Sequence, residues 1–248
     1  MKVKPFLSRD AVKYIAISEM FICHLITRIF IDIPTAELSP IIRFFGHDLS
    51  IIVGPIMFFF IADGFMYTHS RKKYALRLLL FAAVSQIPYT ILEHHTLFTL
   101  SLFTSLNVMF TLFFGLIGLI IWDSKLKLPA RITLIVLLDG ITILLQAEWL
   151  LTAVPVILGL HIFREKPKIR FFWFTLWLML VPLIQFFTGA ESILTSILNG
   201  IFIILVYLMM TKLYSGKKGH HPVFAKWFFY IFYPVHLLII LLIQQTLC

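Results

Sequence analysis

The chain has few charged residues for its length. Only 13% of its 248 residues are charged and 60% are hydrophobic, whereas a soluble domain has roughly 25% charged and 45–50% apolar residues. This deficit excludes an ordinary water-soluble enzyme, and no long polar stretch leaves room for a separate soluble domain. The sequence therefore predicts an all-α, polytopic membrane helical bundle that forms one domain over residues 1–248.

Cysteine and the common catalytic motifs are also scarce. Cys23 and Cys248 alone do not make a disulfide framework. There is no HExxH, no CxxC, no phosphate-binding glycine loop and no G-x-S-x-G elbow. The histidines lack regular metal-ligand spacing, apart from the adjacent pairs at 94–95 and 220–221, which lie in predicted loops. We therefore expect no metal.

Long apolar runs account for most of what is present. Compared with the ~20 residues that a bilayer requires, they predict nine membrane spans. The fifth and sixth are short, and they could instead form one broken hairpin that stops short of a full crossing. The basic N-terminus precedes an apolar run without a small-residue cleavage site, which predicts a retained first helix. The predicted spans are residues 12–31, 49–67, 75–92, 104–122, 131–147, 149–163, 170–187, 192–213 and 227–247.

The basic residues are distributed unevenly among the predicted loops. Nineteen of the 21 fall before the first span, in alternate loops or at the span ends beside them, and only Arg28 and Arg43 fall on the other side. The positive-inside rule then places the N-terminus in the cytoplasm and the C-terminus outside. This topology explains the formal charge of +9 better than a nucleic-acid partner does.

One ionisable residue lies in the middle of the first predicted span. His24 sits halfway along YIAISEMFICHLITRIF, where a charged group costs roughly 2.5–3.5 kcal/mol, so such residues usually face a protein interior or a wet cavity. Lys13 lies eleven residues earlier and Arg28 one turn later, which puts all three on one helix face. Glu19 points about 140° away. The stripe predicts a polar track with an acid–base group; the alternative is a buried neutral histidine flanked by snorkelling cations.

Other predicted spans also carry polar residues. Asp63 lies near the cytoplasmic end of the second span, where it could orient a histidine, pair with Arg77 or simply lie beside the basic loop. Asn107 opens the fourth span and could bind a substrate carbonyl or bridge two helices. Glu148 lies at the predicted outer interface between the fifth and sixth spans.

The last predicted span carries a second deep histidine. Tyr233 and His236 are three residues apart in KWFFYIFYPVHLLIILLI, so they are neighbours on one helix face. Two imidazoles at membrane depth, with Asp63, Asp139 or Glu148 as candidate carboxylates, suit proton transfer near pH 7.

Four segments, taken in order, are similar to the TraX family, whose members resemble the pilin N-terminal acetylase of conjugative plasmids. They are GPIMFFFIADGFMYTHSRKKYALRLLLFAAVSQIPYTIL, SLNVMFTLFFGLIGL, QAEWLLTAVPVILGLHIFR and the terminal KWFFYIFYPVHLLIILLI, and they extend over most of the chain, from residue 54 to residue 243. The first span departs from the pattern, because Cys23 precedes His24 where the family usually has aspartate. Glu148 stands where an aspartate is expected, and Asp63 where a glutamate is common.

The resemblance implies an acetyl-CoA-dependent transfer of an acyl group, in the bacterial cytoplasmic membrane, to an amine or hydroxyl of a peptide or glycan acceptor. His24 would be the general base, and Asp63, His236 or Glu19 would assist it. Asn107, Tyr233, Glu148 and Arg28 would contact substrate. The basic cytoplasmic residues would bind the phosphates of the acyl-CoA; they are Lys13, Arg71, Lys72, Lys73 and Arg77.

Two other functions are compatible with the same residues. The deep histidines could form the proton relay of a transporter or lipid flippase, although the sequence shows neither an internal repeat nor paired broken helices. A non-catalytic factor that recruits an assembly partner through its helices is the other alternative.

Overall fold

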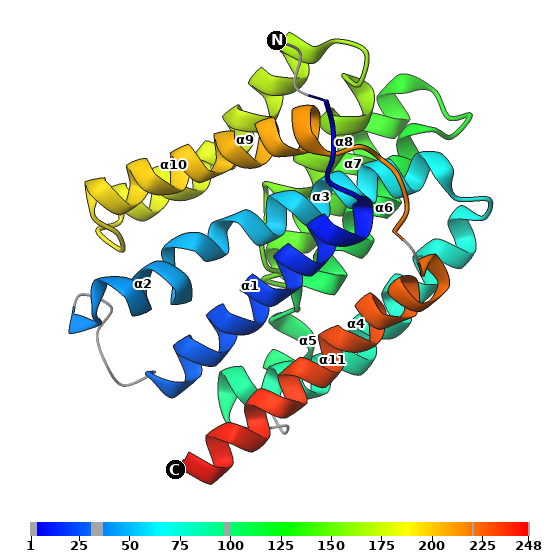
Figure 1. Cartoon of the computed structure of the whole chain (residues 1–248). Coiled ribbons are helices and arrows are strands. Elements are labelled where there is room, and N and C mark those ends of the chain that lie inside the picture. Colours follow the sequence, from blue (N-terminus) through cyan, green and yellow to red (C-terminus); the bar gives the residue numbers. More distant parts are fainter. Residues whose placement is uncertain (1–3, 31–36, 97–99, 220, 248) are drawn as a thin grey trace. The chain divides into compact units, whose positions relative to one another are not determined.

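The computed structural model describes residues 4–30, 37–96, 100–219 and 221–247, and these residues fold into helices with one isolated β-bridge (Figure 1). The helices are α1 (Arg9–Ile29), α2 (Pro40–Gly46), η2 (Asp48–Ile52), α3 (Val53–Tyr67), α4 (Arg71–His94), α5 (Ser101–Thr104), α6 (Val108–Trp122), α7 (Leu128–Leu144), α8 (Ala153–Ile162), α9 (Pro167–Phe187), α10 (Ile193–Leu208), η3 (Met209–Leu213) and α11 (Pro222–Leu247). The predicted all-α class is confirmed.

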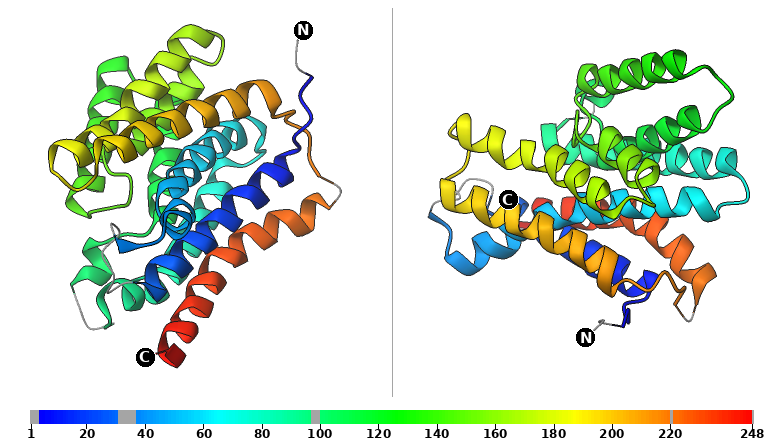
Figure 2. Two further views of the ribbon diagram at one scale, coloured as in Figure 1. Left: turned by 60° about the vertical axis from the view of Figure 1, so that its left-hand side comes forward. Right: turned by 90° about the horizontal axis from the view of Figure 1, so that it is seen from above.

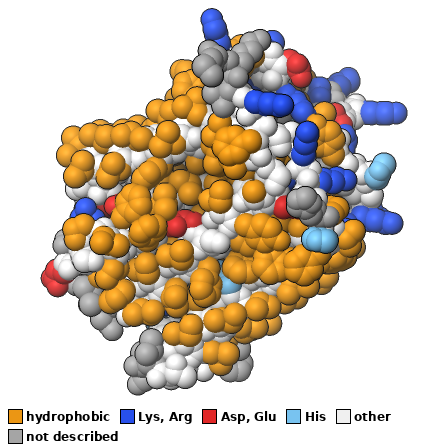
Figure 3. All heavy atoms as spheres, in the orientation of Figure 1, with side chains coloured by type: hydrophobic (Ala, Val, Ile, Leu, Met, Phe, Trp, Pro, Cys, Tyr) orange, Lys and Arg blue, Asp and Glu red, His pale blue; other side chains and the backbone are white. Residues whose placement is uncertain are grey.

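Each of the nine predicted spans contains a helix. Within the described residues, six helical stretches are long and apolar enough to cross a membrane: 40–67, 71–94, 101–122, 167–187, 193–213 and 222–246. Large apolar side chains are exposed along many of these helices, and hydrophobic side chains cover much of the face in Figure 3. The chain is therefore a membrane protein. The α1 helix carries five charged residues in 21, and α7 and α8 are short, so the count of nine crossings stays a prediction.

The chain divides into two compact units. Unit 1 comprises residues 1–57 and 178–248, and unit 2 comprises residues 58–177. The boundaries between the units fall within α3 and α9, and each unit is assembled from several helices.

In unit 1, α1 and α11 lie side by side (Figure 1 and the left view of Figure 2). The segment before α1 also pairs with the segment after η3, because Leu7 bridges Tyr214 and the Gly219 amide donates to Asp10 Oδ2 at 3.0 Å. The loop charges predict that both segments lie on the cytoplasmic side, so this contact agrees with that prediction.

In unit 2, contacts also join helix connections that the loop charges assign to the same side of the membrane. Arg71, at the start of α4, pairs with Asp123 after α6. Arg164, after α8, donates to the Tyr67 hydroxyl at the end of α3 at 3.3 Å. The pKa of Arg164 is raised, chiefly by this hydrogen bond and also by the negative charge of Asp63. The basic connections of unit 2 therefore meet at one end; that this end faces the cytoplasm stays a prediction.

The α6 helix begins beside the middle of α4, far from either end of that helix. The side-chain Nδ2 of Asn107 donates to the Ala82 carbonyl at 3.0 Å and to Gln86 Oε1 at 2.8 Å. Ala82 lies twelve residues before the end of α4 at His94, which is about 18 Å at 1.5 Å per residue. The non-helical residues 105–107 are therefore level with the interior of α4, where backbone must be buried in protein or line a cavity.

Candidate functional site

The two deep histidines meet in unit 1. His24 of α1 and His236 of α11 have their ring centroids 5.5 Å apart. On the same face of α1, Lys13 Nζ lies 4.9 Å from the centroid of the Phe229 ring in α11. The positive charge of Arg28, one turn beyond His24, also acts on the His24 ring. Lys13 and His24 therefore both contact α11, as their shared helix face allows, and the polar track stays a prediction.

His236 is the more completely buried member of the pair. It is 1% exposed, and its Nδ1 lies 3.1 Å from the Phe232 carbonyl oxygen one turn earlier in α11. A carbonyl only accepts, so Nδ1–H donates and the neutral ring keeps its lone pair on Nε2. Among the described residues, that buried Nε2 has no hydrogen-bond partner. The arrangement therefore presents a basic nitrogen of fixed tautomer.

Aromatic rings enclose the His236 ring. Phe232 stacks on it with centroids 5.1 Å apart, and Tyr233 lies at 5.2 Å, as its position three residues before His236 predicts. Phe21 of α1 contributes an edge at 6.5 Å. These rings hold the imidazole in place and separate it from solvent, which suits a group that must stay neutral until it accepts a proton.

Glu19 lies on a different face of α1, as the helical spacing predicts. It is 5% exposed and shares its face with the buried residues Val12, Ala16 and Met20. Among the described residues, its Oε1 has no hydrogen-bond partner. Its assistance to His24 stays a prediction.

Asn107 has a clear structural role in unit 2. Its side-chain Nδ2 donates to α4. Its Oδ1 accepts from the Met109 backbone amide at 3.0 Å, which caps the first turn of α6. Gln86 completes the junction, because its Oε1 also accepts from the Asn107 backbone amide at 3.1 Å. Both ends of the Asn107 side chain are engaged, which favours helix bridging over the alternative of binding a substrate carbonyl.

Glu148 lies in the connection between α7 and α8, as predicted. Its amide donates to the Leu106 carbonyl at 3.1 Å, and its carbonyl accepts from the Thr111 hydroxyl. The Tyr89 hydroxyl of α4 and the Val108 amide of α6 interact with its carboxyl group. This carboxylate therefore lies at the junction that Asn107 and Gln86 organise.

The other predicted residues of unit 2 lie at its basic end. Asp63 lies within electrostatic reach of Arg164. The Arg71 guanidinium lies 4.1 Å from the centroid of the Phe65 ring, and that of Arg77 lies 5.8 Å from the centroid of Tyr74. Lys72 and Lys73 are exposed. A contribution of these cations to acyl-CoA binding stays a prediction.

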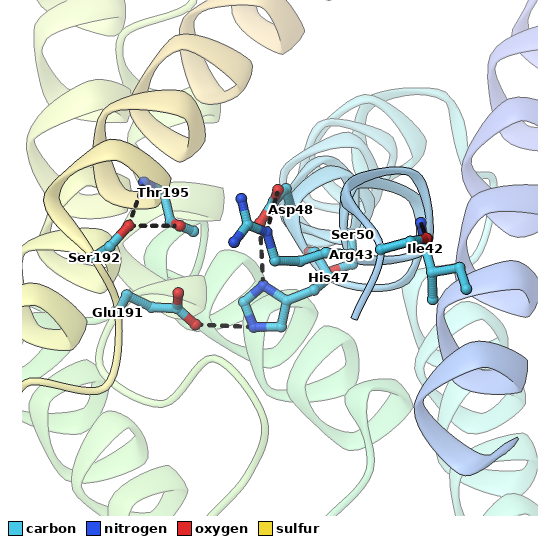
Figure 4. A network of polar contacts seen from close by, with 9 residues as sticks. Ile42, Arg43, His47, Asp48, Ser50, Glu191, Ser192 and Thr195 are labelled. Atoms are coloured by element: carbon cyan, nitrogen blue, oxygen red, sulfur yellow. Dashed lines mark hydrogen bonds and ion pairs between the residues drawn. The ribbon is translucent and has the colours of Figure 1, made fainter. Parts of the chain in front are cut away.

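The sequence did not predict a charged network in unit 1 around His47 (Figure 4). His47 Nε2 lies 3.0 Å from Glu191 Oε1, and its Nδ1 lies 3.4 Å from Asp48 Oδ1. Arg43 Nε lies 3.8 Å from the other oxygen of Asp48, which is 3% exposed. A feature of the sequence that pointed to this network is Arg43, a rare basic residue in a loop predicted to lie outside. We call these four residues the His47 clasp, because they join the turn before α3 to the turn before α10.

The chain matches the family model described as TraX protein over residues 8–244. It is also 31% identical, over 205 residues, to the probable fimbrial assembly protein FimC of serogroup H1 from Dichelobacter nodosus. That alignment covers 79% of this chain and 80% of the relative. The chain belongs to the TraX family. No solved structure matches it.

The TraX-family match spans nearly all the elements described above, from the start of α1 to the last turns of α11. It therefore includes the histidine pair, the Asn107 junction and the His47 clasp. The identification confirms the resemblance carried by the four sequence segments.

Proposed function

We propose that this TraX-family protein is a membrane-embedded acyltransferase. It would move an acetyl or other short acyl group from cytoplasmic acyl-CoA to an amine or hydroxyl of a cell-envelope or peptide acceptor. The observation that carries the proposal is the His24–His236 pair, because two imidazoles in contact, one with a fixed tautomer and an open basic nitrogen, can accept and return a proton.

In the proposed reaction, the acceptor nitrogen or oxygen attacks the thioester carbonyl carbon. His24 takes the proton that the acceptor loses, and Nε2 of His236 is the second proton acceptor of the pair. Collapse of the tetrahedral intermediate breaks the C–S bond, and the departing thiolate takes up the proton as free CoA. Tyr233, beside His236, is the candidate donor to the thioester oxygen.

The experiment is acyl transfer by the purified chain in lipid or detergent. Acetyl-CoA is supplied with two acceptors, a peptide with a free N-terminus and a glycan, and release of free CoA is measured. We expect His24→Ala and His236→Ala each to lower turnover by about 10²-fold or more, in line with loss of an acid–base group. His69→Ala, which removes an exposed histidine between α3 and α4, is the matched control and should leave turnover unchanged.

A non-catalytic role in assembly is the second candidate, because the relative from Dichelobacter nodosus is called a fimbrial assembly protein. If this role is correct, pilus assembly in cells should require the chain but tolerate His24→Ala and His236→Ala. Absence of thioester turnover with both acceptors, together with that tolerance, would reject the acyltransferase proposal.

A further inference from the structure

Two segments of unit 1 that are far apart in the sequence join at the start of α1 (Figure 1). The Leu7 amide donates to the Leu213 carbonyl at 3.0 Å, and the Arg9 amide donates to the Lys217 carbonyl at 2.8 Å. Residues 214–219, which we call the strap, are therefore fixed by backbone hydrogen bonds against the segment that leads into α1.

The start of α11 lies beside the same end of α1. The ring of Tyr14, in the second turn of α1, lies 5.7 Å from the ring of Phe228 and 5.0 Å from that of Phe229, measured between centroids. Both phenylalanines belong to the first turns of α11. The strap, the start of α1 and the start of α11 therefore form one end of unit 1.

This end of unit 1 carries a positive charge. Residues 4–12 and 212–226 contain six basic residues and one acid, Asp10. Asp10 is 6% exposed and accepts from the Gly219 amide and from Arg9 Nε. Its charge is therefore engaged within the protein, whereas five lysines of these segments are exposed. We call them the lysine surface; they are Lys4, Lys212, Lys217, Lys218 and Lys226.

Apolar side chains are exposed next to the lysine surface. Val223, Phe224 and Trp227 are exposed near the start of α11, and Lys226 Nζ lies 4.9 Å from the centroid of the Trp227 ring. The α11 helix is long and apolar enough to cross a membrane, so we expect its first residues at the membrane surface, where tryptophan rings lie at the level of the headgroups. A nucleic acid or a soluble acidic protein would leave these apolar side chains in water. The combination of cations and rings therefore favours a lipid.

We propose that the lysine surface binds the headgroups of anionic phospholipids. The lysine ammonium groups contact the phosphate oxygens, and Trp227 and Phe224 lie among the headgroups beside them. Because the strap pairs with the segment before α1 and leads into α11, a bound lipid holds the starts of both helices at the membrane surface. The binding involves neither an acyl donor nor an acceptor, so it is independent of the proposed function.

The test uses Trp227 as a local reporter. The purified full chain is placed in bilayers that mix phosphatidylcholine with phosphatidylglycerol, and the acyl chains of one lipid or the other are brominated to quench tryptophan fluorescence. Trp227 is the one tryptophan of the five outside residues 58–177. The difference in emission between the wild type and Trp227→Phe therefore reports which lipid lies at this surface. We expect phosphatidylglycerol to be enriched there over phosphatidylcholine.

The double substitution Lys217→Gln and Lys218→Gln should reduce this preference by up to about 5-fold for each lysine removed. Both lysines are exposed, so the change leaves the interior of the protein intact. The matched control is Lys125→Gln with Lys127→Gln, which removes two exposed lysines between α6 and α7 in unit 2. The control should leave the preference at Trp227 unchanged.

Equal quenching of Trp227 by the two brominated lipids would overturn the proposal. Equal losses in the two double variants would also overturn it, because the attraction would then come from the net charge of the whole chain. Inorganic phosphate is added in a parallel measurement, with chloride at the same ionic strength as its control. If phosphate alone abolishes the preference, the lysine surface binds free phosphate and the assignment to lipid is wrong.

Discussion

Replacing Gly46 with alanine tests how closely α1 packs against the end of α2 in unit 1. A Cβ at Gly46 would lie 2.3 Å from Cγ2 and 2.9 Å from Cβ of Ile26, two residues after His24. Ile26 is branched at Cβ and cannot turn both atoms away, so the backbones must separate. Such overpacking costs about 1–3 kcal/mol, and alanine regains about 0.5–1 kcal/mol over glycine in a helix. We expect a net loss of up to about 2.5 kcal/mol in the free energy of unfolding.

The assay is denaturant or thermal unfolding of the purified protein in detergent, with Gly140→Ala as the matched control. Gly140 lies within α7, and no atom lies within 4 Å of its added Cβ, so this change should be neutral or stabilising by up to about 1 kcal/mol. If Gly46→Ala is no less stable than Gly140→Ala, the inferred close packing of α1 on α2 is wrong. Because the displaced helix carries His24, acyl transfer should also fall in Gly46→Ala.

Two further predictions concern the polar contacts. In a double-mutant cycle on the free energy of unfolding, His47→Ala and Glu191→Gln should show a coupling of about 1 kcal/mol. The coupling should weaken with added salt, because the pair is half-buried. Additive losses would mean that the His47 clasp does not join its two turns energetically. Gln86→Leu should lower the free energy of unfolding by about 2–3 kcal/mol, because the buried backbone N–H of Asn107 and one N–H of its side chain lose their acceptor. The exposed Gln245→Leu, measured in the same unfolding assay, should change it little, and equal losses would contradict the role given to the junction.

The positions of the helices could be predicted because apolar runs are a local property of the sequence. The last predicted span, 227–247, falls within α11, and the face shared by Lys13 and His24 follows from helical geometry alone. The neighbourhood of Tyr233 and His236 was predictable for the same reason.

The pairing of His24 with His236 could not be predicted, because it joins opposite ends of the chain and depends on the packing of α1 against α11. Asn107 was predicted to open the fourth span and does cap α6, but its place beside the interior of α4 could not be predicted. The preceding residues are nearly as apolar as the helix itself, and the break is fixed by hydrogen bonds to α4. The His47 clasp escaped notice because His47 and Glu191 are ordinary loop residues until the fold brings them together.

The short α7–α8 hairpin has a consequence for the order in which the protein enters the membrane. The α7 helix has 17 residues and α8 has 10, so α8 is too short to be stable as an independent crossing. In their connection, the backbone amide and carbonyl of Glu148 are satisfied by Leu106 and Thr111. The hairpin is therefore expected to insert as one piece, after the α5–α6 segment is in place, and truncation of the nascent chain within α8 should leave α7 unanchored.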